Sequence, residues 1–377
     1  MWNCGTLIKT VDGKSFNPEH FNTVLKSHVQ EFTFNKYSYK DIEIDGNLKL
    51  PAYTGTLVSN DPNALLNFNG TLDFSNDKTT VDFKADIERL NMNALQIVKD
   101  SLGVFKGHFE LNGTGKNVDL FEGSILAENV SYTNSVETYN FDHLFIKSEF
   151  QENNIRQIDV TSNDIVNGYV RGNFKYNQLK EIVENSLGSL YKNYSPNDIA
   201  TNQFIEYDLK FHNKIVDLLV PKLEIADDTS VSGKITADTG EFILLVNTPF
   251  VKYGQNKFSN VQVDVNSLRQ NQNAFIAIDT IDLKVYKAYD FVLNNAKKND
   301  TLYADTTFKG GTEANDSYQL NFYHTINEEN KSVVGIDKSE IQFKESVWYL
   351  NEFNNDKNRI IFNKEINNFT IEDIQLS

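Results

Sequence analysis

The chain contains little cysteine and little proline, the residues that form disulfides or mark linkers between domains. Its 377 residues contain one cysteine and six prolines. The single cysteine, Cys4, excludes an internal disulfide framework, and its scarcity fits a reducing or an oxidising compartment equally well. No Ser/Gly-rich or low-complexity stretch is present to serve as a linker. The sequence therefore predicts one continuous architecture instead of a series of separate domains.

Positive charge and long apolar runs are also lacking. The formal net charge is -16, from 52 acidic and 36 basic residues, so there is no basic stripe to bind nucleic acid or to dock flat on anionic lipid. The mean hydropathy is -0.45, and no apolar run approaches the ~18 residues of a membrane-spanning helix. The N-terminal stretch MWNCGTLIKTVDGKSF does not read as an export signal. We expect such a signal to be missing, and the chain to be a fragment of a longer protein.

The sequence offers no recognisable catalytic or metal-binding motif. Asp41 to Gly46, DIEIDG, opens like an EF-hand loop, but Ala52 occupies the twelfth position, where a bidentate Glu is required. The six histidines lack zinc-site spacing, and no nucleophile elbow occurs. The carboxylates are spread evenly, as on a solvated face. These features predict a protein that is not an enzyme and that holds no cofactor or metal.

What the chain does contain is an alternation of apolar and polar residues from about Asp41 to the C-terminus. In DPNALLNFNGTLDFSNDKTTVDFKADI the apolar residues share one parity on each side of a turn at Ser75 to Asp77. We therefore expect an all-β fold: an elongated, one-sided antiparallel sheet curled into a trough. At roughly 12 to 15 residues per strand and turn, the chain supplies about 25 strands.

Two short amphipathic helices are predicted to interrupt this pattern. The first, at about 17–32, has Phe21, Leu25, Val29 and Phe32 at helical spacing and lies in an N-terminal segment, 1–40, before a continuous groove at 41–377. The second, at about 178–192, carries an apolar stripe of Leu179, Ile182, Val183, Leu187 and Leu190. A lid or plug packed on the sheet is favoured over a helix that docks to a partner.

The inward parity of the strands gives the candidate binding residues. If the apolar face is a groove, these side chains line it and contact the apolar part of a ligand. They are Leu66, Phe68, Leu72, Phe74, Val81, Phe83, Val166, Val170, Phe174, Val261, Val263, Val265, Leu320 and Phe322.

Several phrases of the sequence resemble the TamB family of the AsmA-like group, the translocation and assembly module. They are DPNALLNFNGTLDFS (Asp61 to Ser75), IVNGYVRGNFKYNQL with the following helix to SLGSLYKNY (Ile165 to Tyr194), YQLNFYHTINEENKSVVG (Tyr318 to Gly335) and INNFTIEDI near the C-terminus. The resemblance covers most of the chain from about Tyr37 onward, and it contains no catalytic motif.

This resemblance implies a middle segment of a periplasmic bridge in a Gram-negative bacterium, a β-taco anchored in the inner membrane through a segment absent here. It implies a role in outer-membrane biogenesis, either phospholipid transport or assembly of outer-membrane proteins with a TamA-like barrel partner. A continuous apolar floor favours phospholipid acyl chains as the ligand, since each buried methylene contributes about 0.8 kcal/mol. A chaperone groove for outer-membrane barrel proteins or autotransporters, and a packed β-solenoid scaffold, stay open as alternatives.

Overall fold

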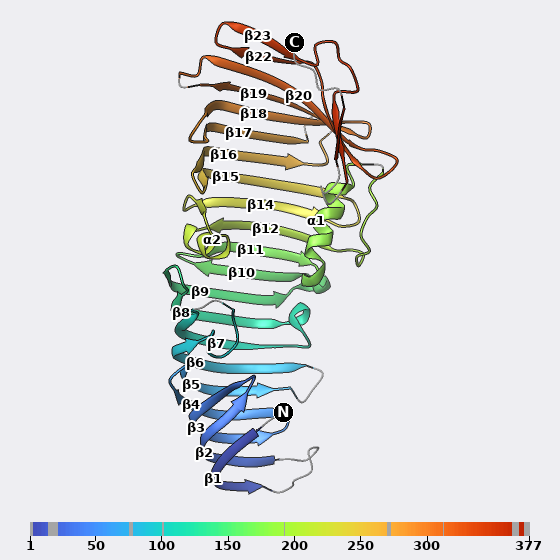
Figure 1. Cartoon of the computed structure of the whole chain (residues 1–377). Coiled ribbons are helices and arrows are strands. Elements are labelled where there is room, and N and C mark those ends of the chain that lie inside the picture. The colour runs from blue at the N-terminus through green and yellow to red at the C-terminus, as the bar shows by residue number, and fades with distance from the viewer. Residues whose placement is uncertain are drawn as a thin grey trace. The chain divides into compact units, whose positions relative to one another are not determined.

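The computed structural model is all-β, as the alternation predicts, with 65% of the chain in strands and 8% in helices (Figure 1). It describes residues 3–13, 22–74, 78–99, 102–191, 193–269, 273–311, 313–363 and 369–372. The chain divides into two compact units, Met1–Tyr169 (unit 1) and Val170–Ser377 (unit 2). Sequence analysis predicted no division at this point.

Unit 1 is an antiparallel meander in which each strand pairs with the next along the chain. Most of the described connections are two to six residues long, so the alternation restarts soon after a strand ends, whereas residues 92–103 separate the sixth strand from the seventh. The strands are β1 (Asn3–Gly13), β2 (Asn22–Phe34), β3 (Tyr37–Lys49), β4 (Ala52–Asp61), β5 (Ala64–Asp73), β6 (Thr79–Asn91), β7 (Val104–Gly115), β8 (Glu122–Thr133), β9 (Thr138–Phe150) and β10 (Arg156–Ser162). Strand β11 (Val166–Asn173) lies at the division between the units.

Unit 2 continues the same plan with two helices added. Its elements are α1 (Leu179–Gly188), β12 (Phe204–Phe211), α2 (Asn213–Leu219), β13 (Leu223–Ile225), β14 (Thr229–Thr236), β15 (Glu241–Tyr253), β16 (Asn256–Asn266), β17 (Ala274–Asp282), β18 (Lys287–Lys298), β19 (Thr301–Gly310) and β20 (Asp316–Ile326). Then follow β21 (Ser332–Ile336), β22 (Ser339–Phe343), β23 (Ser346–Leu350), β24 (Arg359–Phe362) and β25 (Phe369–Glu372). Short 3-10 turns are η2 (Val118–Leu120), η3 (Glu152–Asn154) and η4 (Tyr176–Gln178).

The ladder of unit 2 runs from β12 through β14 to β20, and the sheet forks at β20. One half of β20 pairs with β21 and the other half with β22. The two branches continue as β21–β24–β25 and β22–β23. Strand β13 pairs with the far end of β15, beyond the part that pairs with β14.

The helix predicted at about 17–32 is wrong for the described part of that range, because residues 22–34 form strand β2, paired with β1 and β3. Residues 14–21 lie outside the described residues. Leu25 and Val29 are four residues apart, a spacing that fits one face of a helix and equally one face of a strand. The domain boundary predicted at 40/41 falls inside β3, so 1–40 is not a separate segment.

The second predicted helix is confirmed as α1, which contacts β14 and β15. It crosses the ends of the strands instead of running parallel to them (Figure 1). Ile182 is fully buried, whereas Leu187 of the predicted stripe is 40% exposed. The helix is therefore packed on the sheet. In the described part of the chain, no helix is long and apolar enough to cross a membrane.

Candidate functional site: two apolar sheet faces

The register of unit 1 places its large apolar side chains on one face. Residues directly opposite each other on paired antiparallel strands share a face, so a row of partners can be followed across the sheet. One such row is Ile44, Leu57, Phe68, Ala85, Phe109, Ala127 and Leu144. A neighbouring row contains Phe83, Leu111, Ile125, Ile146 and Val160. We call these two rows, with Leu66, Leu72 and Val81, the unit-1 apolar face.

The opposite face of unit 1 is polar and charged. The row behind Phe68 is Val58, Asn67, Asp86, His108, Glu128 and His143. His108 Nδ1 lies 2.6 Å from Asp86 Oδ1, and Lys84 Nζ lies 2.5 Å from Glu110 Oε1. The hydrogen bond with Asp86 raises the pKa of His108, while that with Lys84 lowers the pKa of Glu110. This face is therefore solvated, and the sheet of unit 1 has one apolar face and one polar face.

Unit 2 repeats the arrangement with an apolar row that crosses eight strands. The row consists of Leu209, Val231, Val246, Val263, Ile276, Leu293, Thr306 and Leu320. A parallel row contains Leu244, Val265, Ala274, Asn295, Ala304 and Phe322. We call these rows, with Val261, Ile205, Ile235, Phe242 and His324, the unit-2 apolar face.

The candidate residues inferred from parity fall largely on these two faces. Leu66, Phe68, Leu72, Val81 and Phe83 share the unit-1 apolar face. In unit 2, Val263 and Leu320 lie in one row, with Val265 and Phe322 in the next. The register therefore brings together side chains that are more than fifty positions apart in the sequence.

Four candidates need separate comment. Phe74 directly follows the end of β5 and is 54% exposed, so it lies just outside the paired strand, and its role as a lining residue stays a prediction. Val166 and Val170 lie in β11, on either side of the division between the units. Phe174 follows β11, is buried, and packs edge-on against Tyr176 at a centroid distance of 5.5 Å.

Sequence reasoning missed part of both faces. Leu111, Ile125 and Ile146 of unit 1 were not singled out, nor were Ile276 and Leu293 of unit 2 as lining residues. The signal was clear for Leu111, which lies between Glu110 and Asn112, but the other four residues each have at least one apolar neighbour, as Ile276 has in Phe275 and Ala277, so strand parity is ambiguous there. What the sequence could not show is which alternating segments are ladder neighbours.

Both faces remain partly open to solvent. Phe68, Phe83, Val263 and Phe322 are all only half-buried. The accessible surface of the chain is 22426 Å² at a mass of 43.1 kDa. Two separate compact domains of half this mass would together expose about 18,000 Å². The excess indicates sheets that lack the second packed layer of an ordinary domain.

The unit-2 face is well buried at one end of its strands. Ile205, Ile235 and Phe242 are 8%, 5% and 7% exposed, and the register aligns them in one row. Ile235 and Phe242 lie beside the turn that joins β14 to β15, and α1 contacts both of these strands. Farther along the same strands, Val231 and Val246 are half-buried. Helix α1 therefore lies at the end of the apolar face that is most deeply buried, and the face is more open to solvent farther along the strands.

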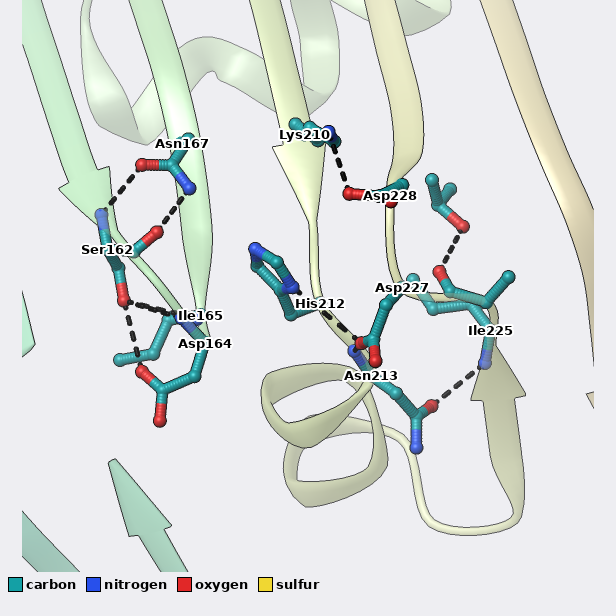
Figure 2. Close-up of polar contacts among 12 residues, drawn as sticks. Ser162, Asp164, Ile165, Asn167, Lys210, His212, Asn213, Ile225, Asp227 and Asp228 are labelled. Carbon is teal, nitrogen blue, oxygen red and sulfur yellow. Dashed lines mark hydrogen bonds and ion pairs between the residues drawn. The ribbon is translucent and has the colours of Figure 1, made fainter. Parts of the chain in front are cut away.

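The polar clusters near β10 hold turns together. Ser162 is fully buried, and its Oγ donates to the His143 carbonyl oxygen at 2.6 Å. The same Oγ accepts from the Ile165 N–H at 3.1 Å (Figure 2). Asp164 Oδ1 lies 3.2 Å from the same hydroxyl. A nucleophilic serine needs an accessible Oγ beside a base, whereas this hydroxyl is committed to the backbone.

In unit 2, the contacts around α2 are also structural. Asp227 Oδ1 accepts the Asn213 N–H at the start of the helix at 3.0 Å and lies 3.7 Å from His212 Nδ1 (Figure 2). Asn213 Oδ1 in turn accepts the Ile225 N–H at 2.9 Å. These bonds fix α2 against β13. Across the described residues, no group of three or more His, Cys, Asp or Glu side chains is placed to hold a metal ion.

Comparisons of the chain with family models, with curated proteins and with solved structures found no match. The two apolar faces are therefore interpreted from their own geometry.

Proposed function

We propose that the two apolar faces hold the acyl chains of phospholipids, and that the chain is a segment of a TamB-like periplasmic bridge that conducts lipid between the two membranes of a Gram-negative envelope. The observation that carries this proposal is the uncovered apolar face, continuous in register across the paired strands of each unit. Aliphatic and aromatic side chains there are only half-buried, in a chain whose mean hydropathy is -0.45.

The energetics favour a long, flexible apolar ligand. Each methylene moved from water onto such a surface is stabilised by about 0.8 kcal/mol. Leu66, Phe68 and Phe83 present similar chemistry at successive positions, so an acyl chain that slides between them exchanges one apolar contact for another. Charged groups of the ligand can stay in solvent at the open side. Passive sliding therefore needs no catalytic residue and no cofactor.

A chaperone that receives unfolded outer-membrane strands is the second candidate. It would bind by pairing with strand edges instead of the apolar face. A packed β-solenoid scaffold is less favoured, because most of the described strands pair antiparallel with the next strand along the chain, as β4 to β7 do, instead of stacking as successive coils.

The test is native mass spectrometry with lipid extraction on the chain purified from a Gram-negative envelope. Phe68→Glu and Phe322→Glu place a charge on the apolar face of each unit. The matched controls, Asn67→Glu and Gln319→Glu, place the same charge on exposed positions of the opposite faces. We expect phospholipid to co-purify with the wild type and with the controls, and to be lost in the double variant Phe68→Glu/Phe322→Glu.

Circular dichroism and thermal melting establish that each variant is folded. A folded wild type without lipid, or lipid retained after both apolar substitutions, would contradict the proposal. Loss of lipid in the controls as well as in the apolar-face variants would do so too, because it would show that binding does not depend on the apolar face.

A further inference from the structure

The segment that follows α1 reaches across the ladder of unit 2 to strand β20. We call Ser189 to Tyr191 together with Asn193 the strap. Tyr191 Oη lies 2.5 Å from His324 Nδ1, and the two rings meet edge to face with centroids 5.0 Å apart. Asn193 Nδ2 donates to the Ile326 carbonyl oxygen at 2.9 Å. These contacts join residues that are 133 positions apart in the sequence.

The other end of the strap is attached near β14 and β15. Ser189 Oγ lies 2.7 Å from the Ser186 carbonyl oxygen of α1 and 3.4 Å from that of Gly240, in the turn between these strands. Strands β15 and β20 are five ladder steps apart and do not pair with each other. The strap thus bridges strands that do not touch one another in the ladder.

The strap lies on the apolar side of the sheet. His324 alternates with Phe322 and Leu320 along β20, so all three side chains belong to the unit-2 apolar face. Helix α1 covers the row of Ile235 and Phe242 on the same face. Together, α1 and the strap form a cover over one end of this face, which we call the lid.

The lid has a base at α1 and a tip, formed by Tyr191 and Asn193, at β20. More hydrogen bonds hold the base than the tip. Asn185 on α1 accepts hydrogen bonds from Tyr194 Oη at 3.1 Å and from the Asn197 N–H at 2.8 Å, and its own amide donates to the Asn197 carbonyl oxygen at 2.9 Å. The ring of Tyr194 packs directly on Gly188, where an added Cβ would lie 2.3 Å from the ring. The chain therefore folds back tightly on α1 beyond the strap.

The tip is held by neutral groups. Burial lowers the pKa of His324 and raises the pKa of Tyr191 to about 12, so the hydrogen bond joins an uncharged phenol and an uncharged imidazole. A single hydrogen bond between neutral groups contributes less stability than the several contacts at Asn185. The hold on β20 can therefore break while the base of the lid stays in place.

We propose that Tyr191 and His324 form a clasp that closes the lid, and that the clasp opens when an acyl chain enters or leaves the covered end of the unit-2 apolar face. The entry role rests on the proposed function. The opening of the lid does not, and it is measured without lipid.

The first measurement is the rate of maleimide labelling at Ile235→Cys, beneath the lid, in a Cys4→Ser background that removes the chain's one native cysteine. Tyr191→Phe deletes the hydroxyl and keeps the ring. We expect it to accelerate labelling roughly 2- to 10-fold, the effect of losing one neutral hydrogen bond. Labelling at Val263→Cys, on the open face, and at Ala288→Cys, buried elsewhere in unit 2, should not change. Equal rates at Ile235→Cys, or acceleration at all three sites, would overturn the clasp.

The second measurement locks the lid. Tyr191→Cys and His324→Cys are joined by a short bismaleimide, and Tyr191→Cys capped with a monofunctional maleimide is the control. We expect the crosslink to slow the release of pyrene-labelled phosphatidylethanolamine to acceptor vesicles, and Tyr191→Phe to speed it. If lipid binds but both variants release it at the wild-type rate, the entry role of the clasp is wrong. If the wild type takes up no lipid, the proposed function fails, whatever the labelling rates show about the lid.

Discussion

Phe68 on β5 and Phe83 on β6 lie with their ring centroids 5.1 Å apart and their planes tilted by 37°. They are diagonal neighbours on the unit-1 apolar face, since Phe68 is opposite Ala85 and Phe83 is opposite Gly70. The pair links two strands through side chains that stay half-buried. Aromatic contact here stabilises the sheet and at the same time provides the surface proposed for acyl chains.

A double-mutant cycle measures this contact. Phe68→Ala and Phe83→Ala should each destabilise unit 1, and the double variant should lose about 0.5–1.5 kcal/mol less than the sum of the two. Urea unfolding followed by circular dichroism gives the four free energies of unfolding. Strictly additive effects would show that the rings do not interact.

Gly70 allows β5 to lie close to the β6 backbone at Asp82 and Phe83. A Cβ at position 70 would come within 2.4 Å of the Phe83 Cβ and 2.2 Å of the Asp82 carbonyl oxygen. Gly70→Ala should therefore lower the free energy of unfolding by about 1–3 kcal/mol through overpacking. Asn69→Ala, on the adjacent exposed position, is the control and should change stability far less. A tolerated Gly70→Ala would mean that the two strands can separate locally without cost.

Asp61, the last residue of β4, joins the beginning of β3 to the turn that follows β4. It is 1% exposed and accepts hydrogen bonds from Tyr37 Oη at 2.6 Å, from the Lys40 N–H at 2.8 Å and from the Asn63 N–H at 2.8 Å. Asp61→Ala leaves these donors without their acceptor, so we expect a loss of about 3 kcal/mol.

Asp61→Asn keeps one side-chain oxygen as an acceptor and should lose less than Asp61→Ala. Hydrogen exchange of the Lys40 and Asn63 amides reports the effect locally. Protection of both amides that stays at the wild-type level in Asp61→Ala would show that the carboxylate is dispensable.

Ile182 and Leu187 provide a matched pair on α1. Ile182 is 0% exposed and Leu187 is 40% exposed. Ile182→Ala should destabilise unit 2 by about 2–5 kcal/mol because it leaves a cavity between α1 and the sheet. Leu187→Ala should cost well under half as much. Similar losses at the two positions would contradict the orientation of the helix.

His108 makes the stability of unit 1 depend on pH. Its pKa is raised above the ordinary 6.5, mainly by the hydrogen bond with Asp86. The stabilisation is therefore fully present below the unfolded-state pKa and is lost as the pH rises through the folded-state value. The difference in unfolding free energy between the wild type and His108→Gln should stay below about 1 kcal/mol, and it should shrink between about pH 6 and 8.

An NMR titration of the His108 ring tests the direction of the shift directly. His143 lies in the same row, 3.5 Å from Glu128, and serves as a second resonance on the same face. A His108 pKa below 6.5 would contradict the Asp86 contact.

The alternation in segments such as Leu66 to Asp73 determined the all-β class, the turns and the parity of each strand, because side chains on a strand point to opposite faces in turn. The sequence also located α1, because the apolar residues of that segment recur at helical spacing and do not alternate with polar residues as in a strand. The same reasoning wrongly predicted a helix at about 17–32. Leu25 and Val29 are four residues apart, and this spacing fits one face of a helix as well as one face of a strand.

Only the tertiary structure decided which strands pair and which parts of each face are covered. Val263 and Leu320 share a row because the strands between them pair in one particular register, and register depends on contacts between distant segments. The same holds for Tyr191 and His324, whose contact across 133 positions leaves no trace in local periodicity. The sequence thus determined the apolar faces, and the long-range pairing determined where α1 and the strap cover the face of unit 2.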